Sequence, residues 1–407
     1  MKLFLKSVLP LFFVLIIDAM SFGIVIPILG PMLLEPSSQF LPSNTPLDVR
    51  TLYYSLCLGL PMVFMFVGAP LMGDISDQIG RKKALIIAML GLTLSCLVSA
   101  GGVVIGSVFL LVLGRCILGF MDSSESVAKA AIADISHSPK QKVLNLSLAS
   151  VAGTAGFVLG PMIGGLVSTM VSGGEYAYTM PFLLAAGLAF MNVVFLCFLF
   201  KETYHPKKRT KIHILNSFKN LSAAFSNKHV RMLSFIFFCM QFTWGTYFQS
   251  VSILLVKAFQ FDSQKIGFFY SFLSCFFVIT LSIIIRILLK FFEQNTIVII
   301  SMVLVLLGSL IISTLHTEMS AWISVIPMSI GLGLGYNTML SLFSEAVDKD
   351  SQGRIMGAAV GIFSIAWVIS SVVGGLLSSE NLYLPYMIAS VIAFVGLIAA
   401  FFVGKKA

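Results

Sequence analysis

Residues 73–83 read Gly-Asp-Ile-Ser-Asp-Gln-Ile-Gly-Arg-Lys-Lys, and this charged stretch lies between two long apolar ones, 51–73 and 84–105. Each apolar stretch is longer than the ~18 residues that a helix needs to cross the hydrocarbon core of a bilayer. Gly73 and Gly80 permit a tight chain reversal, and the charges suit the ends of two helices. The stretch therefore predicts two antiparallel membrane helices joined by a charged turn.

The composition extends this prediction to the whole chain. Of its 407 residues, 58% are hydrophobic and 11% are charged, whereas about a quarter of the residues of a soluble domain are charged. We expect an all-α integral membrane protein with twelve transmembrane helices and no soluble domain between them. The predicted spans are 8–34, 51–73, 84–105, 107–133, 143–170, 181–200, 232–256, 266–290, 295–315, 320–346, 355–378 and 384–403.

The positive charge is distributed unevenly over these spans. The net charge is +9, and most of the 26 lysines and arginines fall in loops on one side of the predicted topology. The exceptions are Arg50, Lys257 and Lys265 on the other side, and Arg115 and Lys129 within a helix. Basic loops mark the cytoplasmic side, so both termini are predicted to be cytoplasmic, and the charge requires no nucleic-acid partner.

One predicted cytoplasmic connection is much longer than the rest. It divides the chain into an amino-terminal six-helix bundle at 1–200, a linker at 201–231 and a carboxy-terminal six-helix bundle at 232–407. Within the linker, apolar residues recur at helical spacing at Ile214, Phe218, Leu221 and Phe225. This pattern, beside several lysines, predicts an amphipathic helix on the inner leaflet, either a plain surface linker or a regulatory element.

The stretch 73–83 also matches a known loop pattern, Gly-x-x-x-Asp-x-x-Gly-Arg-Lys. The matching residues are Gly73, Asp77, Gly80, Arg81 and Lys82. The pattern belongs to the major facilitator superfamily, which the chain resembles. The resemblance implies two pseudo-symmetric six-helix bundles that rock about a central site, with this loop and the acidic Asp134 gating the cytoplasmic side.

A second resemblance narrows the family. The predicted helix 143–170 carries a cluster of residues that permit close packing and bending, namely Gly156, Gly160, Pro161, Gly164 and Gly165. The cluster is similar to the core of the antiporter motif of drug:proton exporters, although Ser147 stands where that motif has a further glycine. Asp18, Gly23 and Pro27 resemble the first-helix pattern of the same exporters, and Arg115 with Gly119 resembles their fourth-helix motif.

Ionisable residues inside the predicted spans are the candidate proton carriers. Each costs about 2.5–3.5 kcal/mol at the bilayer centre and therefore calls for a partner or a purpose. Asp18 and Arg115 lie at similar depths, which predicts an ion pair between them, either permanent or sensitive to protonation. None of the five histidines falls in a predicted span, so we expect a transported proton to ride on a carboxylate, Asp18 or Asp122.

The predicted helix 107–133 carries a stripe of charge. Asp122, Glu125 and Lys129 fall on one face with Arg115, and such a stripe should face an interior cavity. It points toward a polar or zwitterionic substrate, with Asp122 and Lys129 as contacts. Glu125 and Lys129 are four residues apart and can equally neutralise each other.

The second half offers neutral groups instead. Gln241, Trp244 and Tyr247 lie in the predicted helix 232–256, and Asn337 lies in 320–346. We expect these side chains to orient a polar substrate against an aromatic wall, although they can equally form hydrogen bonds between helices.

The sequence thus predicts a secondary transporter, a proton-coupled antiporter that exports a small polar or amphiphilic molecule by alternating access. Two alternatives stay open: a proton-symporting importer of a polar nutrient or iron chelate (siderophore), and a non-transporting membrane sensor. We expect no enzymatic activity, no metal site and no cofactor, because the proton gradient drives transport. The expected partners are a small-molecule substrate, protons and the lipid bilayer, for a monomer in the bacterial inner membrane.

Overall fold

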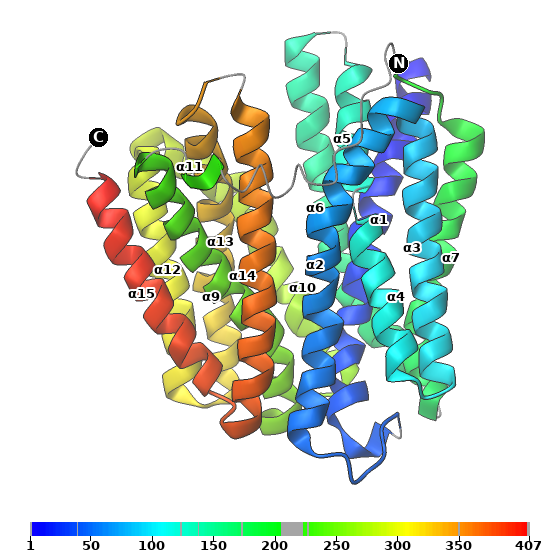
Figure 1. The fold of residues 1–407 in the computed structure, drawn as a ribbon, viewed down its shortest axis with the longest axis vertical. Coiled ribbons are helices and arrows are strands. Elements are labelled where there is room, and N and C mark those ends of the chain that lie inside the picture. Colours follow the sequence, from blue (N-terminus) through cyan, green and yellow to red (C-terminus); the bar gives the residue numbers. More distant parts are fainter. Residues whose placement is uncertain are drawn as a thin grey trace. The chain divides into compact units, whose positions relative to one another are not determined.

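The computed structural model describes residues 2–38, 40–122, 124–136, 138–171, 174–204, 223–225, 228–348 and 351–404. These residues are helical throughout, apart from short connections, and contain no strand. The helices are α1 (Lys2–Leu34), α2 (Leu47–Ile79), α3 (Arg81–Val104), α4 (Val108–Met121), α5 (Ser124–Asp134), α6 (Pro139–Met170), α7 (Gly174–Leu199), α9 (Lys228–Phe259), α10 (Ser263–Ile279), α11 (Ile285–Phe291), α12 (Gln294–Leu315), α13 (Glu318–Glu345), α14 (Gln352–Glu380) and α15 (Leu384–Gly404) (Figure 1). Short turns of other helix types are η1 (Pro36–Ser38), η2 (Ala223–Phe225) and η3 (Thr280–Ile284).

The prediction of an all-helical membrane protein is confirmed. Ten helices among the described residues are long and apolar enough to cross a membrane. The other two predicted crossings are α9, which carries the polar residues Gln241 and Gln249 in its middle, and the pair α4–α5. The fold is therefore consistent with the twelve predicted crossings.

The predicted span 107–133 is not one continuous helix. It is interrupted after Met121, because Asp122 leaves the helical conformation with φ −73° and ψ 70°. The chain becomes helical again at Ser124, which begins α5 with Glu125 in its first turn. Aspartate and serine side chains compete with the helix for backbone hydrogen bonds, which explains why the break occurs here. The break places the Asp122 side chain at a helix end.

The predicted span 266–290 is likewise irregular. Its middle is the π-helical turn η3, which joins α10 to α11. The side chain of Thr280, the first residue of this turn, donates a hydrogen bond to the carbonyl of Phe276 at 2.7 Å. Such turns insert one extra residue into a helix and are frequent at functional sites.

The described chain divides into two compact units. Unit 1 comprises Met1–Asn44, Val63–Ile214 and Asp262–Ser271, and unit 2 comprises Thr45–Met62, Leu215–Phe261 and Phe272–Ala407. α2 and α10 each contribute residues to both units. The predicted amphipathic helix at Ile214, Phe218 and Leu221 lies outside the described residues.

Within unit 1, α1 and α6 lie side by side at very short range (Figure 1). A Cβ atom added at Gly160 would lie 2.8 Å from the carbonyl oxygen of Met20. Gly156 and Gly164 lie one turn before and one turn after Gly160. Cβ atoms at these two positions would likewise overlap the carbonyl oxygens of Ile16 and Ile24. The glycines of the predicted antiporter motif therefore let two backbones touch.

The remaining residues of this motif make the same kind of contact. A Cβ atom at Gly165 would overlap the backbone at Ser263 in α10, and a Cβ atom at Gly23 would lie 2.8 Å from Cδ of Pro161. In the same region, the hydroxyl of Ser271 donates a hydrogen bond to the carbonyl of Val158 at 2.7 Å. The motif thus joins α6 to both α1 and the unit 1 part of α10.

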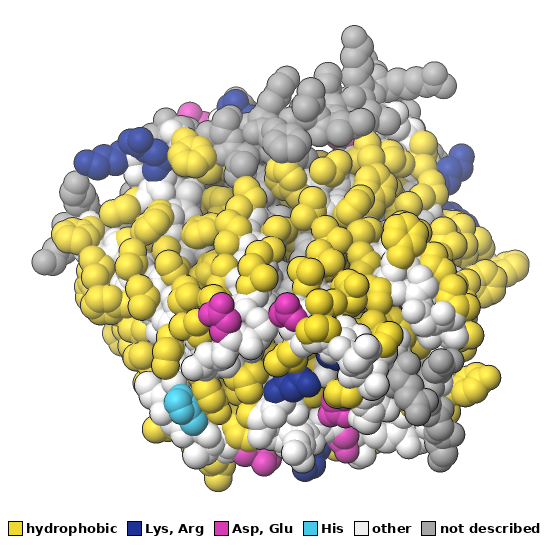
Figure 2. Space-filling model, turned by 60° about the horizontal axis from the view of Figure 1, so that its bottom comes forward, with side chains coloured by type: hydrophobic (Ala, Val, Ile, Leu, Met, Phe, Trp, Pro, Cys, Tyr) yellow, Lys and Arg dark blue, Asp and Glu magenta, His cyan; other side chains and the backbone are white. Residues whose placement is uncertain are grey.

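Hydrophobic side chains predominate on the face drawn in Figure 2, where charged side chains are few. Large apolar residues such as Phe109 and Phe198 are strongly exposed. Such extensive apolar exposure fits a surface that contacts lipid rather than water.

We predict that Gly160→Ala destabilises the protein by about 1–3 kcal/mol, because the added methyl group overpacks the α1–α6 contact. Gly153→Ala, in the same helix, is the matched control, because nothing lies within 4 Å of the Cβ position at Gly153. Alanine favours a helix over glycine, so the control should unfold at the same temperature or slightly above it. Thermal unfolding in detergent measures both variants, and equal unfolding temperatures would contradict the packing argument.

Candidate functional site

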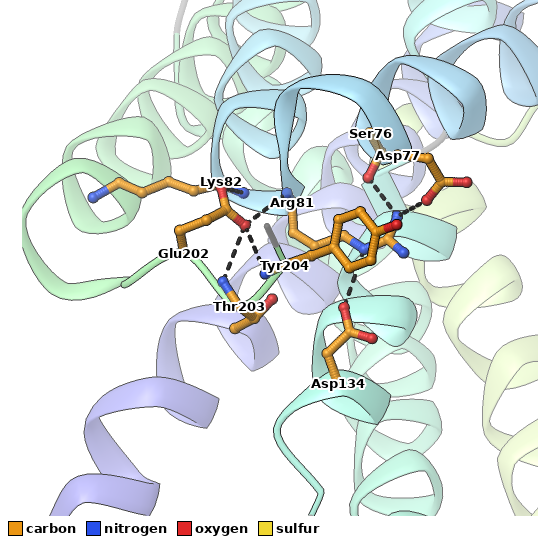
Figure 3. Close-up of polar contacts among 8 residues, drawn as sticks. All are labelled: Ser76, Asp77, Arg81, Lys82, Asp134, Glu202, Thr203 and Tyr204. Atoms are coloured by element: carbon orange, nitrogen blue, oxygen red, sulfur yellow. Dashed lines mark hydrogen bonds and ion pairs between the residues drawn. The ribbon is translucent and has the colours of Figure 1, made fainter. Parts of the chain in front are cut away.

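The ends of α2, α3 and α5 meet at the side chain of Arg81 in unit 1. One terminal nitrogen of its guanidinium donates hydrogen bonds to Ser76 Oγ and Asp77 Oδ1, each at 2.7 Å. Its Nε donates to Asp134 Oδ2 at 3.2 Å (Figure 3). We call these residues, together with Glu202 and Tyr204, the Arg81 cluster. Through the cation of Arg81, it holds together Asp77 and Asp134, two acidic residues of the predicted gate.

Glu202, just beyond the end of α7, completes the cluster. Its carboxylate accepts hydrogen bonds from the backbone N–H groups of Arg81 at 2.8 Å and Lys82 at 3.1 Å. The N–H groups of Thr203 and Tyr204 donate to the same carboxylate at 3.0 and 3.1 Å. A carboxylate is well placed at a helix N-terminus, where unpaired N–H groups and the helix dipole both favour negative charge. Glu202 therefore caps α3.

This cap explains why residue 80 is glycine. Gly80 has φ +96°, which glycine adopts readily and other residues rarely do. A Cβ atom there would also lie 2.7 Å from Cδ of Glu202. The chain reversal predicted at both glycines occurs at Gly80 alone, because α2 continues through Gly73 to Ile79.

Tyr204 supports Arg81 from a second direction. The Cζ atom of Arg81 lies 4.8 Å from the centroid of the Tyr204 ring, which is a cation–π contact. Nearby, Nζ of Lys82 donates a hydrogen bond to the carbonyl of Cys197 at 2.8 Å. The residues that follow α7 are thus tied to the loop between α2 and α3 (Figure 3).

Glu202 and Tyr204 were not among the residues predicted from the sequence. Glu202 lies 121 positions from Arg81 along the chain, and no local pattern links two such distant residues. The sequence feature that could have identified Glu202 is its position, since it is an acidic residue at the start of a strongly basic connection.

The second group of charged residues in unit 1 lies where α4 is broken. Asp18, in the middle of α1, faces Ser124 and has Asp122 and Glu125 as its main charged neighbours. Arg115 is buried, acts on Asp122, and places its guanidinium 5.7 Å from the centroid of the Phe22 ring. We call Asp18, Asp122 and Glu125 the acidic cluster.

The predicted pairing of Asp18 with Arg115 stays a prediction. Asp122 and Glu125 are acidic neighbours of Asp18. Arg115 balances part of the negative charge of Asp122.

Glu125 and Lys129 form the ion pair that their spacing allowed. Oε1 of Glu125 and Nζ of Lys129 are 2.5 Å apart, and the two side chains are 58% and 37% exposed. Among the described residues, no group of three or more histidine, cysteine or acidic side chains is placed to hold a metal ion.

The neutral residues predicted to contact substrate lie in unit 2. Gln241 is fully buried in α9, and Trp244 stacks on Tyr247 with ring centroids 6.3 Å apart. The hydroxyl of Tyr247 shares a hydrogen bond of 2.8 Å with Ser324 Oγ in α13. Asn337, also in α13, is exposed. Trp244 and Tyr247 thus contact each other, and the role of all four residues as substrate contacts stays a prediction.

Comparison with known proteins gives a family and several relatives. The family model described as Major Facilitator Superfamily matches residues 11–371. The tetracycline resistance protein of class H from Pasteurella multocida is 24% identical over 98% of this chain and 97% of its own length. The class C tetracycline resistance protein of Escherichia coli is 25% identical, over 86% of this chain and 84% of its own.

Solved structures share the fold at lower identity. The human organic anion transporter MFSD10 (TETRAN) superposes with a TM-score of 0.71 at 19% identity, over 97% of this chain and 99% of its own. A D-xylose-proton symporter gives a TM-score of 0.73 at 14% identity, over 98% of this chain and 97% of its own. These likenesses establish the architecture of the chain.

We predict that Glu202→Gln lowers the stability of the protein by about 1–2 kcal/mol. The substituted amide keeps one acceptor oxygen but turns an NH₂ group toward backbone donors, and it removes the charge at the start of α3. Thermal unfolding in detergent measures the loss. The control is Glu380→Gln, because Glu380 is an exposed residue at the carboxy-terminal end of α14. This substitution should change the unfolding temperature little. Unfolding of Glu202→Gln at the wild-type temperature would show that the cap contributes nothing.

Proposed function

The chain belongs to the Major Facilitator Superfamily and is therefore a membrane transporter, and we propose that it exports a small drug-like molecule in exchange for protons. The main support is its similarity to a tetracycline resistance protein along nearly the whole length of both chains. The glycine contacts between α1 and α6 add support, because they are made by the residues that resemble the antiporter motif of drug:proton exporters.

In the proposed mechanism, the acidic cluster carries the proton. Two carboxylates at close range in surroundings of low dielectric constant repel each other, so one of them takes up a proton more readily than an isolated carboxylate does. Asp18 and Asp122 are so placed, and Arg115 acts on one of the two. A movement of α1 relative to the α4–α5 break changes the distance between the two carboxylates and hence their affinity for the proton.

The Arg81 cluster is proposed to be the cytoplasmic gate. It joins the ends of three helices through hydrogen bonds that a helix movement can break one at a time. Arginine suits this role because its planar guanidinium can bind several acceptors and a ring face at once. The protein would then work in the inner membrane of a bacterium, with both termini in the cytoplasm.

A proton-symporting importer is the second candidate. One observation favours it: the exposed Glu125–Lys129 pair presents both signs of charge, which suits a zwitterionic substrate. The fold is compatible with either direction of transport, since a D-xylose-proton symporter shares it.

Lumenal pH in proteoliposomes distinguishes the two candidates. On addition of tetracycline outside, we expect lumenal alkalinisation with the wild type, because entry of the drug by antiport expels protons. Asp18→Asn and Asp122→Asn remove the titrating groups and should reduce the pH change to that of protein-free liposomes.

Asp48→Asn is the matched control for these variants, since Asp48 is exposed in the first turn of α2, and it should behave like the wild type. Acidification by a zwitterion or an iron chelate would instead indicate symport and overturn the proposed direction. Full exchange by both Asp18→Asn and Asp122→Asn would remove the acidic cluster from the mechanism.

A further inference from the structure

In unit 2, α9 and α14 bury polar side chains against each other. Nε2 of Gln249 donates hydrogen bonds to the carbonyl of Trp367 at 3.1 Å and to Ser370 Oγ at 2.9 Å. Ser370 Oγ in turn donates to the carbonyl of Trp367 at 2.9 Å. Gly245, one turn before Gln249, lets the two helices approach, because a Cβ atom there would lie 2.5 Å from Ser370 Oγ.

Several buried polar atoms of α9 and α14 have no hydrogen-bond partner among the described residues. They are Nε2 and Oε1 of Gln241, Oε1 of Gln249 and Nε1 of Trp367. The side chains are 0%, 2% and 7% exposed, respectively. A buried polar atom left without a partner costs about 1–3 kcal/mol.

These atoms lie close together along the two helices. Gln241, Gly245 and Gln249 follow one another at intervals of four residues, so they share one face of α9. Cδ1 of Trp367, which is bonded to Nε1, lies 3.5 Å from the Cβ position at Gly245. The N–H edge of the indole therefore faces α9 between the two glutamines.

Packing alone does not explain these residues. A leucine at residue 241 would fill much of the same volume without an unpaired amide, and membrane helices pack closely through small residues. Buried polar groups kept at a cost in stability are characteristic of binding sites. Gln241 therefore has the properties of a residue whose partner is a ligand.

The surroundings determine which ligand can fit. No aspartate, glutamate, lysine or arginine occurs between Arg231 and Lys257, the stretch that forms the middle of α9. The same holds between Arg354 and Glu380 in α14. The contact thus offers hydrogen-bond donors and acceptors without a formal charge.

Aromatic rings adjoin the unpaired atoms. The Phe248 ring lies 5.5 Å from the Trp367 ring and 5.5 Å from the Trp244 ring, at 45° in both cases. These rings form an apolar wall beside the amide and indole groups, and such a wall suits a flat ring system.

We propose that Gln241, Gln249 and Trp367 form a binding site for the uncharged, hydrogen-bonding groups of the transported molecule, with Trp244 and Phe248 packing against its rings. The ligand class is a flat ring compound that carries hydroxyl, carbonyl or carboxamide groups. This assignment rests on the proposed function, because it names the substrate class of the exporter.

The first test uses ligand-free protein. Gln241→Leu should raise the thermal unfolding temperature by a few degrees, because it removes an unpaired amide from the interior. In the presence of tetracycline, a ring compound with hydroxyl and carboxamide groups, the same variant should bind at least about tenfold more weakly than the wild type. A lower unfolding temperature of the ligand-free variant would identify Gln241 as a structural residue and overturn the proposal, and so would unchanged tetracycline binding.

Tryptophan fluorescence gives an independent measurement, since the chain has three tryptophans, Trp244, Trp322 and Trp367. Trp322 is the matched control, because it packs against Phe261 and Phe272 instead of the unpaired amides. Tetracycline should quench the wild type and Trp322→Phe alike, and Trp367→Phe should lose both affinity and most of the quenching. Equal quenching and affinity in Trp367→Phe would overturn the proposal.

Failure of this inference is distinguishable from failure of the proposed function. If the wild type shows neither quenching nor transport of tetracycline, export of this drug is refuted. The unfolding temperature of ligand-free Gln241→Leu still decides the site: stabilisation supports it and destabilisation overturns it.

Discussion

The close contact between α1 and α6 is the constraint on which unit 1 depends. In a lipid bilayer, the hydrophobic effect does not drive one apolar helix against another. Close van der Waals contact must therefore stabilise the association of the two helices. Gly156, Gly160 and Gly164 supply this contact at intervals of four residues against the backbone of α1. Such a contact fixes the rotation of α1 about its own axis. Asp18 lies two residues beyond Ile16, about 200° around the helix, and therefore points away from α6 toward the break that follows α4.

The same rotation decides how charge is arranged inside unit 1. Because Asp18 faces the broken helix, it meets Asp122 and Glu125, and Arg115 is left to balance Asp122. The break at Asp122 and the glycines of α6 are thus two separate local features that together create one cluster.

The sequence predicted those features that depend on local pattern. Span lengths, the reversal at Gly80 and the residues around Arg81 follow from apolar runs and from a motif of contiguous residues. Features that depend on distant partners were missed: Glu202 caps a helix that begins 121 positions earlier, and Trp367 resembles any other aromatic residue in an apolar run. The break at Asp122 was missed because aspartate and serine are only mildly unfavourable within a helix. The expected Asp18–Arg115 pair stays a prediction, because depth specifies position along the bilayer normal and leaves rotation undetermined.

The two units place different chemistry in the membrane, and this difference bears on how protons and substrate can be coupled. Amide and indole groups do not titrate near neutral pH, so binding at the proposed α9–α14 site has no intrinsic dependence on pH. In the proposed mechanism, the pH dependence of transport enters through the carboxylates of the acidic cluster in unit 1. A proton and a ligand that do not compete for one group can influence each other only by favouring different conformations, and this influence is reciprocal: each changes the affinity for the other by the same factor. Coupling between proton and substrate therefore passes through the conformational equilibrium of the protein, while the proton gradient supplies the energy.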